Sequence, residues 1–314
     1  MTPTSINIGL SGEYQFEITK ADGSIESTGW MKNLVLDSGL DRLGNGPSSG
    51  LSGPVYYARV GTGTSTPTTS QTSLDSQLAS QAATNSAAQS TVNSGAPNYT
   101  TTHVFKYSFA QGAVVGNISE VGVGWTAAAA GTLFSRSRIV DSSNNPTTLT
   151  IVALDQFTVY YRLQVTPSLI DVNGSVVIGG TTYNYLSRVA SVGNFAGTPS
   201  IFTDNSVSML NTGSMGSYSG TTTSTIGANT AQPTNTTFES PTVTSPTSYV
   251  PGSFYKDINF SWSISQAVYG GGLKTLDIYS SGGWCHFQYS FTPVIPKTNS
   301  NVLALTFRYS WNRS

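Results

Sequence analysis

The feature that most constrains this chain is an alternation of apolar and polar residues that recurs along its length. It is clear in Tyr14-Gln-Phe16-Glu-Ile18 and in the run from Phe157 to Val165, where aromatic and aliphatic residues hold every second position. Alternation with a period of two is typical of β-strands that bury one face. Helical periodicity is almost absent, so the sequence predicts an all-β fold.

Two short helical turns are expected to bridge strands. Residues 37–43 begin with Asp37, a residue type that caps helices, and precede Gly44, which can end one. The second turn is expected at residues 73–78.

Length and composition favour a subunit of an assembly. The chain has 314 residues, the length of two domains of about 150 residues each. Only 9% of its residues are charged, whereas soluble globular proteins average about 25%. Ser, Thr, Asn and Gly therefore solvate much of the surface. These short neutral side chains lose little conformational entropy when a partner covers them.

Charge and cysteine content exclude several classes of protein. The 14 basic and 15 acidic residues are scattered singly and give a net charge of −1, so neither a nucleic-acid partner nor an anionic membrane is expected. We find no signal-peptide pattern and no stretch near the ~18 apolar residues of a membrane span, so synthesis in a cytoplasm is expected. Cys285 is the only cysteine, which excludes an intrachain disulfide and a multi-cysteine metal site.

The second half of the sequence restates the order of features in the first half. The corresponding segments are 16–25 and 169–176 (hairpins turning on Asp22-Gly23 and Asn173-Gly174), 56–60 and 185–189, 105–109 and 258–262, 117–123 and 272–278, 133–136 and 286–289, 149–152 and 303–306, and 159–162 and 307–310. An internal duplication explains this order; two β-meanders sharing ordinary strand chemistry are the alternative. We predict two similar antiparallel β-sandwich-like domains in tandem, residues 1–167 and 168–314.

Each predicted domain contains one long segment rich in Ser, Thr and Gly, at 61–102 in the first and 203–252 in the second. These segments have too few apolar residues to form cores of their own. We predict that they are long loops that become ordered on neighbouring subunits, with simple surface decoration as the alternative.

No residue pattern predicts a catalytic, cofactor-binding or metal-binding site. Cys285 and His286 are adjacent, but neighbouring residues of a strand point to opposite faces and cannot hydrogen-bond to each other. A buried Cys285 beside a partly exposed His286 is expected instead. The other histidine, His103, has no further ligands at a recognisable spacing, so neither a metal nor a cofactor is predicted.

Carboxylates that are close in sequence are explained by helix capping and turns. Examples are Asp37 with Asp41 and Asp22 with Glu26. A glycosidase would need a carboxylate pair brought together from distant segments, and that alternative stays open. We predict that the chain is not an enzyme.

Aromatic residues are dense near the C-terminus. Because they hold alternate strand positions, we expect most of them to fill a core; stacking of exposed rings on a sugar is the alternative. The set comprises Trp262, Tyr269, Tyr279, Trp284, Phe287, Tyr289, Tyr309 and Trp311.

Five stretches of the first half match phrases of a known family in the same order. They are 32–44 (KNLVLDSGLDRLG), 57–74 (YARVGTGTSTPTTSQTSL), 118–124 (ISEVGVG), 133–139 (LFSRSRI) and 149–163 (LTIVALDQFTVYYRL). In these stretches the chain resembles the tail-fibre-like and minor tail proteins of tailed bacteriophages. The resemblance implies a virion role, origin in the bacterial host cytoplasm, and no catalytic residues. The chain departs from it by lacking a heptad or collagen-like shaft and a recognisable receptor-binding tip.

Together, the residues and the resemblance predict a virion structural protein of the tail, baseplate or collar region. It is expected to form a homo-oligomer, with a trimer or hexamer favoured, and to attach neighbouring tail proteins. A receptor-binding tail protein that recognises a host surface glycan or pilus is the first alternative. An enzyme acting on surface polysaccharide is the second.

Overall fold

The computed structural model of the protein describes residues 4–45, 53–84, 89–93, 100–192, 202–203, 206–207, 216–229, 231–245, 248–279 and 285–314. Within these ranges the chain is mostly β-strand, with one α-helix, α1 (Asp37–Asn45). The predictions of an all-β fold and of a short helix after residue 36 are confirmed. The prediction of a helical turn at residues 73–78 is wrong, because a strand begins at Gln77. None of the helical structure in the described ranges is long and apolar enough to cross a membrane.

The strands fall into two sets. Those of the first half are β1 (Thr4–Thr19), β2 (Ile25–Ser27), β3 (Met31–Lys32), β4 (Leu34–Val35), β5 (Tyr57–Gly61), β6 (Gln77–Ala82), β7 (Gln89–Asn93), β8 (Thr100–Ser108), β9 (Gly116–Ile118), β10 (Glu120–Gly124), β11 (Leu133–Arg138), β12 (Leu149–Ile151) and β13 (Gln156–Pro167). Those of the second half are β14 (Val172–Ile178), β15 (Thr181–Val192), β16 (Phe202–Thr203), β17 (Ser206–Val207), β18 (Gly216–Gly220), β19 (Thr236–Glu239), β20 (Thr242–Thr244), β21 (Tyr255–Trp262), β22 (Leu273–Tyr279), β23 (Cys285–Ile295) and β24 (Leu303–Arg313).

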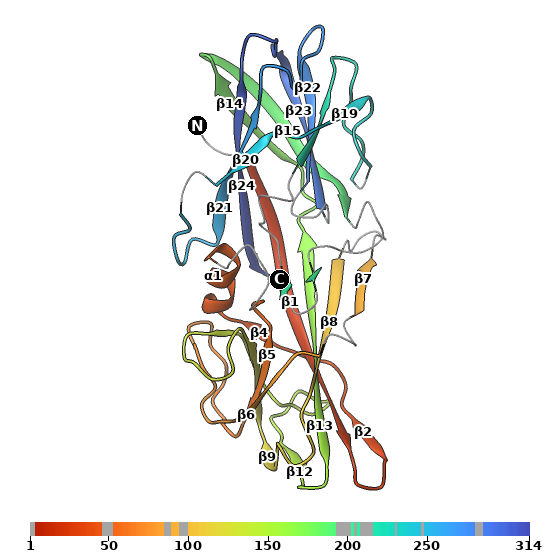
Figure 1. Ribbon diagram of the computed structural model, residues 1–314, viewed down its shortest axis with the longest axis vertical. Helices are drawn as coiled ribbons and strands as arrows, with labels where there is room; N and C mark the ends of the chain where they lie inside the picture. Colours follow the sequence, from red (N-terminus) through yellow and green to blue (C-terminus); the bar gives the residue numbers. More distant parts are fainter. Residues whose placement is uncertain are drawn as a thin grey trace.

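Three sheets make up most of the molecule. The central sheet has nine strands in the order β20-β21-β24-β1-β13-β8-β7, with β2 and β3 also paired to β1. The first-half sheet has the order β4-β11-β10-β5-β6, and the second-half sheet has the order β14-β15-β23-β22-β18-β19. Figure 1 shows an elongated molecule in which the two smaller sheets lie toward opposite ends and β1 runs between them.

Both smaller sheets pack against the same face of the central sheet. The even-numbered residues of β1 from Ile6 to Ile18 are buried, whereas the odd-numbered residues between them are not. On this face Tyr14 shares a hydrogen bond of 2.8 Å with Ser135 Oγ of the first-half sheet. The ring of Tyr289, from the second-half sheet, lies 5.0 Å from the ring of Phe307 in the central sheet. The result is one contiguous apolar core that includes residues of both halves.

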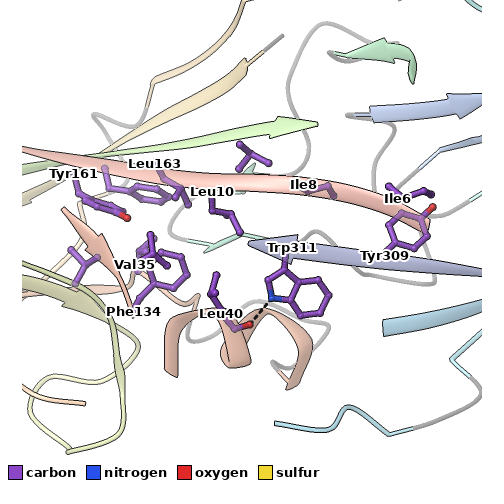
Figure 2. Close-up of a cluster of buried hydrophobic side chains, with 14 of the residues drawn as sticks. Ile6, Ile8, Leu10, Val35, Leu40, Phe134, Tyr161, Leu163, Tyr309 and Trp311 are labelled. Atoms are coloured by element: carbon purple, nitrogen blue, oxygen red, sulfur yellow. Dashed lines mark hydrogen bonds between the residues drawn. The ribbon is translucent and has the colours of Figure 1, made fainter. Parts of the chain in front are cut away.

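The two halves meet at the N-terminal part of β1 and at α1. Figure 2 shows Ile8 and Leu10 of β1 near Trp311 of β24, with Leu40 of α1 facing them. The indole Nε1 of Trp311 donates a hydrogen bond of 2.9 Å to the carbonyl of Leu40. Arg313 forms an ion pair with Asp37 at the start of the same helix. The last strand of the second half is thereby fixed to the helix of the first half.

The strand order of the central sheet is pseudo-symmetric about β1. β13 pairs with β1 antiparallel and places Pro167 opposite Ile8, whereas β24 pairs with β1 parallel and places Arg313 opposite Leu10. β13 and β24 therefore run in opposite directions, and their C-terminal ends flank β1 near Gly9, one on each side. Beyond them the order β13-β8-β7 on one side matches β24-β21-β20 on the other. In the smaller sheets, β4-β11-β10-β5-β6 matches β15-β23-β22-β18-β19 in the same way.

Several sequence predictions differ from this arrangement. The pairing of β1 with β24 is parallel, so the sheets are not antiparallel throughout, and the nine-stranded sheet is continuous across residue 167. The segments 61–102 and 203–252, predicted as loops, contribute β6, β7, β17, β18, β19 and β20. Of these, β6, β7, β19 and β20 are short strands at sheet edges, where few large apolar side chains are needed, whereas β18 lies inside the second-half sheet between β22 and β19. Of the paired segments, 56–60 and 185–189 do not correspond, since β5 lies between β10 and β6 whereas β15 lies between β14 and β23. The segments 149–152 and 303–306 do not correspond either, since β12 pairs with β9 in a separate two-stranded sheet whereas residues 303–306 begin β24.

The two predicted hairpin turns have different outcomes. The turn at Asp22-Gly23 is confirmed, with Gly23 at φ 85° and Asp22 accepting a hydrogen bond from the Ser24 amide. The prediction of a turn at Asn173-Gly174 is wrong, because both residues lie inside β14. Gly179-Gly180 makes the turn there, at φ 56° and 82°, values that glycine adopts without steric cost.

Candidate interaction surfaces

The histidine beside the single cysteine lies in a buried polar pair. Asp277 on β22 and His286 on β23 are both buried. The Nδ1 atom of His286 is 3.1 Å from each carboxylate oxygen of Asp277. The expectation of a partly exposed His286 is therefore wrong. The side chain of Cys285 lies outside the described residues.

The second histidine is distant from this pair. His103 lies on β8 in the central sheet, buried, with its ring 4.4 Å from the ring of Phe105. Across the ranges that the structure describes, no group of three His, Cys, Asp or Glu side chains is arranged to hold a metal ion.

The carboxylates singled out in the sequence have structural partners. Asp37 forms an ion pair with Arg313, and Asp41 accepts hydrogen bonds from Tyr249 Oη at 2.7 Å and from the Gly252 amide at 2.6 Å. Asp41 thus joins α1 to a segment far along the chain. This contact was not predicted, since nothing in the local sequence indicates it.

A buried ion pair anchors the loop between β5 and β6. Glu120 and Arg136 are fully buried, and Arg136 donates to Glu120 Oε2 from Nη2 at 2.7 Å and from Nε at 3.1 Å. Glu120 also accepts hydrogen bonds from the amides of Gly63 (2.9 Å), Ser76 (2.8 Å) and Asp75 (3.1 Å). A single carboxylate therefore fixes both ends of residues 62–76 over the outer face of the first-half sheet.

Asp75 extends this network toward the surface. Its carboxylate lies 2.8 Å from Arg136 Nη2 and accepts a hydrogen bond of 3.0 Å from the Ser65 amide. Hydrogen bonding from Ser65, together with the charge of Arg136, lowers the pKa of Asp75 below its ordinary value. Asp75 is therefore ionised at neutral pH, and its charge contributes to holding the loop.

A second buried arginine holds the neighbouring loop. Arg59 on β5 donates to the carbonyls of Thr126 (2.9 Å from Nε), Ala129 (3.2 Å) and Thr132 (3.1 Å). A guanidinium with several fixed donors suits this task, because it satisfies several carbonyls of a tight loop at once. Residues 126–132 are therefore held in one shape beside the loop 62–76.

In the second half the corresponding loop is held mainly by glutamine side chains, with one further hydrogen bond of 3.1 Å from Arg188 Nη1 to the Gly227 carbonyl. Gln288 on β23 is fully buried; its Oε1 accepts from the Gly227 amide at 2.7 Å, and its Nε2 donates to the Ala231 carbonyl at 3.1 Å. Gln232, from the same loop, lies 3.3 Å from Asp277 Oδ2. The loop between β18 and β19 thus lies over the outer face of the second-half sheet, as residues 62–76 do over the first.

The polar pairs of the two sheets share one geometry. Glu120 faces Arg138 across the ladder and binds the residue two positions earlier, Arg136. Asp277 faces Gln288 and binds the residue two positions earlier, His286. Each half therefore buries an acidic and a basic residue as a diagonal cross-strand pair. Sequence reasoning missed both pairs, although a charged residue inside an apolar strand is a signal in a chain with so few charges.

The opposite face of the central sheet carries matching surface ion pairs. Arg162 on β13 binds Glu13 and lies over the Trp30 ring at 4.3 Å, and Arg308 on β24 binds Asp257 and lies over the Tyr255 ring at 3.7 Å. Arg162 is as far along β13 from Pro167 as Arg308 is along β24 from Arg313, and Pro167 and Arg313 are the residues that face β1 near Gly9.

The predicted aromatic core is largely confirmed. Among the residues of that set, those fully buried are Trp262, Phe287, Tyr289, Tyr309 and Trp311. Tyr269 and Tyr279 are half-buried, and Trp284 lies outside the described residues. A separate cluster, not singled out in the sequence, lies on the outer face of the second-half sheet: Phe238 is 51% exposed, and its ring lies 5.4 Å from that of Tyr218 and 6.5 Å from that of Tyr279.

Exposed apolar residues gather at the end of the molecule formed by the first half. Val115 and Val152 adjoin the paired strands β9 and β12, and Leu154 follows them. Ile25 begins β2, which Figure 1 places at the same end. These four side chains are between 47% and 64% exposed, so this tip offers a small apolar contact surface.

Comparisons with protein-family models, with curated protein sequences and with solved structures find no match for this chain. The family resemblance thus rests on the five sequence stretches alone.

Proposed function

We propose that this chain is a non-enzymatic structural subunit of a bacteriophage virion, in the tail, baseplate or collar region, which forms a homo-oligomer and attaches neighbouring tail proteins. The observation that carries the proposal is the use of buried polar side chains to hold loops. Residues 62–76 contain one charged residue, Asp75, and residues 221–235 contain none. Loops that are neutral and already fixed lose little entropy and little hydration when another subunit covers them.

We further propose that the halves are two β-sandwich-like domains, residues 1–167 and 168–314, that arose by duplication. Two features support this: the matching strand orders and the equivalent surface arginines. Phe105 of β8 faces Tyr161 of β13, and Ile258 of β21 faces Phe307 of β24. Tyr161 and Phe307 lie equally far from the C-terminal ends of their strands, and the facing segments 105–109 and 258–262 also correspond in sequence. In this proposal β1 completes both domains.

Location in the particle is the direct test. Virions of the phage that encodes this chain should contain it by mass spectrometry, and gold-labelled antibodies should bind at the tail in electron micrographs. Absence of the chain from purified particles, or its presence only in infected-cell lysate, would refute the structural role. A count of copies per particle would also discriminate a trimer from a hexamer.

A receptor-binding tail protein is the second candidate, favoured by one observation. The rings of Tyr218, Phe238 and Tyr279 lie together on the outer face of the second-half sheet, beside the buried His286. Aromatic faces next to polar groups can stack on sugar rings. Binding of the purified protein to host surface polysaccharide, lost in Phe238→Ala, would support this candidate. Release of reducing ends from that polysaccharide would instead indicate an enzyme.

A further inference from the structure

The longest free sheet edge in the described part of the chain is β14. It has seven residues and pairs, among the described strands, with β15 alone. The other outer strands are shorter: six residues in β6, five in β7, four in β19, three in β20 and two in β4. Among the described strands of the first half β14 has no counterpart, because β4, the equivalent of β15, is the outermost strand there.

Nothing on β14 protects this edge from pairing with another strand. Folded proteins protect exposed edges with charged side chains, prolines or bulges. The sequence of β14, VNGSVVI, has no charge and no proline, and its register with β15 is unbroken. Asp171, just before the strand, is bound to Arg188 of the same chain. A second copy approaching this edge therefore meets no uncompensated like charge.

The hairpin geometry determines which backbone groups face outward. In a two-residue turn of the type made by Gly179-Gly180, the flanking residues Ile178 and Thr181 form a hydrogen-bonded pair. Hydrogen-bonded and non-hydrogen-bonded pairs then alternate along the ladder. The N–H and C=O groups of Asn173, Ser175 and Val177 consequently point away from β15.

These outward groups are complementary to a second copy of themselves. In an antiparallel pair centred on Ser175, Ser175 faces Ser175 of the second copy, and Asn173 faces Val177, so every outward donor meets an outward acceptor. The same centre places Val172 opposite Ile178 and Gly174 opposite Val176. These four are the less exposed residues of the strand, so the core-facing side of one sheet continues into that of the other.

We propose that two copies of this chain associate through their β14 strands, antiparallel about Ser175, to join the two second-half sheets into one. This proposal rests on the homo-oligomer in the proposed function and specifies its contact. A contact of this kind has twofold symmetry, so the assembly contains an even number of copies. A hexamer is compatible with it, and an isolated trimer is not.

Cysteine cross-linking tests the contact directly. Directly facing residues of a hydrogen-bonded antiparallel pair have Cα atoms about 5.5 Å apart, within the range of about 4.4–6.8 Å that a disulfide requires. In a Cys285→Ala background, Ser175→Cys should form a covalent dimer when treated with oxidised glutathione. Asn184→Cys is the matched control: it faces Ser175 from β15 and is exposed, but lies one strand inward, so no dimer should form.

Proline at the same position provides the second test. Ser175→Pro removes an outward N–H and leaves the ladder with β15 intact, so the mass by light scattering should fall at least twofold, whereas Ser175→Ala should keep the wild-type mass. A Ser175→Pro protein of unchanged mass, together with no cross-linked Ser175→Cys dimer, would refute the β14 contact while the homo-oligomer stands. A wild-type chain that stays at its monomer mass of 33.0 kDa at every concentration, or an odd number of copies, would refute the contact as well.

Discussion

The two halves share a strand order but close the outer edge of their smaller sheets differently. In the first half the edge strand β4 has two residues, after which the Leu36 amide and the Ser38 hydroxyl donate to carbonyls of β11 and α1 begins. In the second half the edge is extended by the hairpin of β14 and β15. One end of the molecule therefore satisfies its own edge, whereas at the other the outer side of β14 pairs with no strand that the structure describes.

A second difference concerns how the covering loops are held. The Glu120–Arg136 ion pair and Arg59 fix the loops of the first half, whereas Gln288, Gln232 and one hydrogen bond from Arg188 fix that of the second. Removing one member of a buried ion pair leaves a charge without compensation, whereas neutral hydrogen bonds cost less to break. Substitutions in the two buried polar pairs should thus have unequal effects.

The largest effect is expected for Arg136→Ala. It leaves Glu120 buried without its cation, which should lower the free energy of unfolding by about 3–5 kcal/mol. His286→Ala, in the diagonal pair of the second half, should cost about 1–3 kcal/mol because it removes a hydrogen bond to Asp277. Urea unfolding of both variants measures the difference. Equal losses would mean that the two polar pairs contribute alike.

The next effect is expected for Ile8→Ala at the junction of the halves. Ile8 is fully buried and faces Pro167 on one side and Trp311 on the other. Its truncation should cost about 2–4 kcal/mol and destabilise both halves together. Ile264→Ala, at a residue 54% exposed, is the control and should change stability by less than about 0.5 kcal/mol. Destabilisation confined to one half, seen by hydrogen exchange, would contradict a shared junction.

A smaller effect is expected for Gly39→Ala in α1. Alanine normally stabilises a helix by about 1 kcal/mol relative to glycine. Here a Cβ would lie 2.2 Å from the Phe134 carbonyl oxygen of β11, so we expect a net loss of about 1–3 kcal/mol. Gly29→Ala is the control, since nothing lies within 4 Å of its Cβ position. A stabilised Gly39→Ala protein would show that α1 does not press against this sheet edge.

The smallest effect is expected for Asp75→Asn. Because the pKa of Asp75 is lowered in the folded protein, its contribution to stability is present above the unfolded pKa of about 4 and is lost as pH falls through the folded value. The variant should lose about 1 kcal/mol or less at neutral pH and show a weaker decline of stability in acid. Thermal unfolding between pH 2 and 7 measures both. An unchanged acid profile would remove Asp75 from the network.

The fold class and part of the internal correspondence could be predicted from sequence. Alternation predicts strands because it reports one buried face, and it identified 105–109, 258–262 and the closing strands correctly. It could not predict that β1 pairs with strands of both halves, because a strand buried on one face carries no signal of which neighbour it pairs with. The edge strands at 77–82 and 236–239 were missed since they lack apolar alternation.

The candidate surfaces were less predictable. The loop-holding residues Glu120, Arg136 and Gln288 act through backbone groups far away in sequence, and such contacts leave no local pattern. The free edge of β14 was hidden by the Asn173-Gly174 pair, which resembles a turn. Only the position of the Gly179-Gly180 turn shows that these residues lie within a strand.

Native-state hydrogen exchange tests the central claim, that one strand completes both halves, most directly. Residues 156–167 of β13 and 303–313 of β24 are the segments to compare, since both pair with β1. Measured by mass spectrometry at increasing urea, their amides should open with the same free energy, within about 1 kcal/mol, because loss of β1 exposes both edges at once. A β24 segment that exchanges at much lower free energy, while β13 stays protected, would contradict the account.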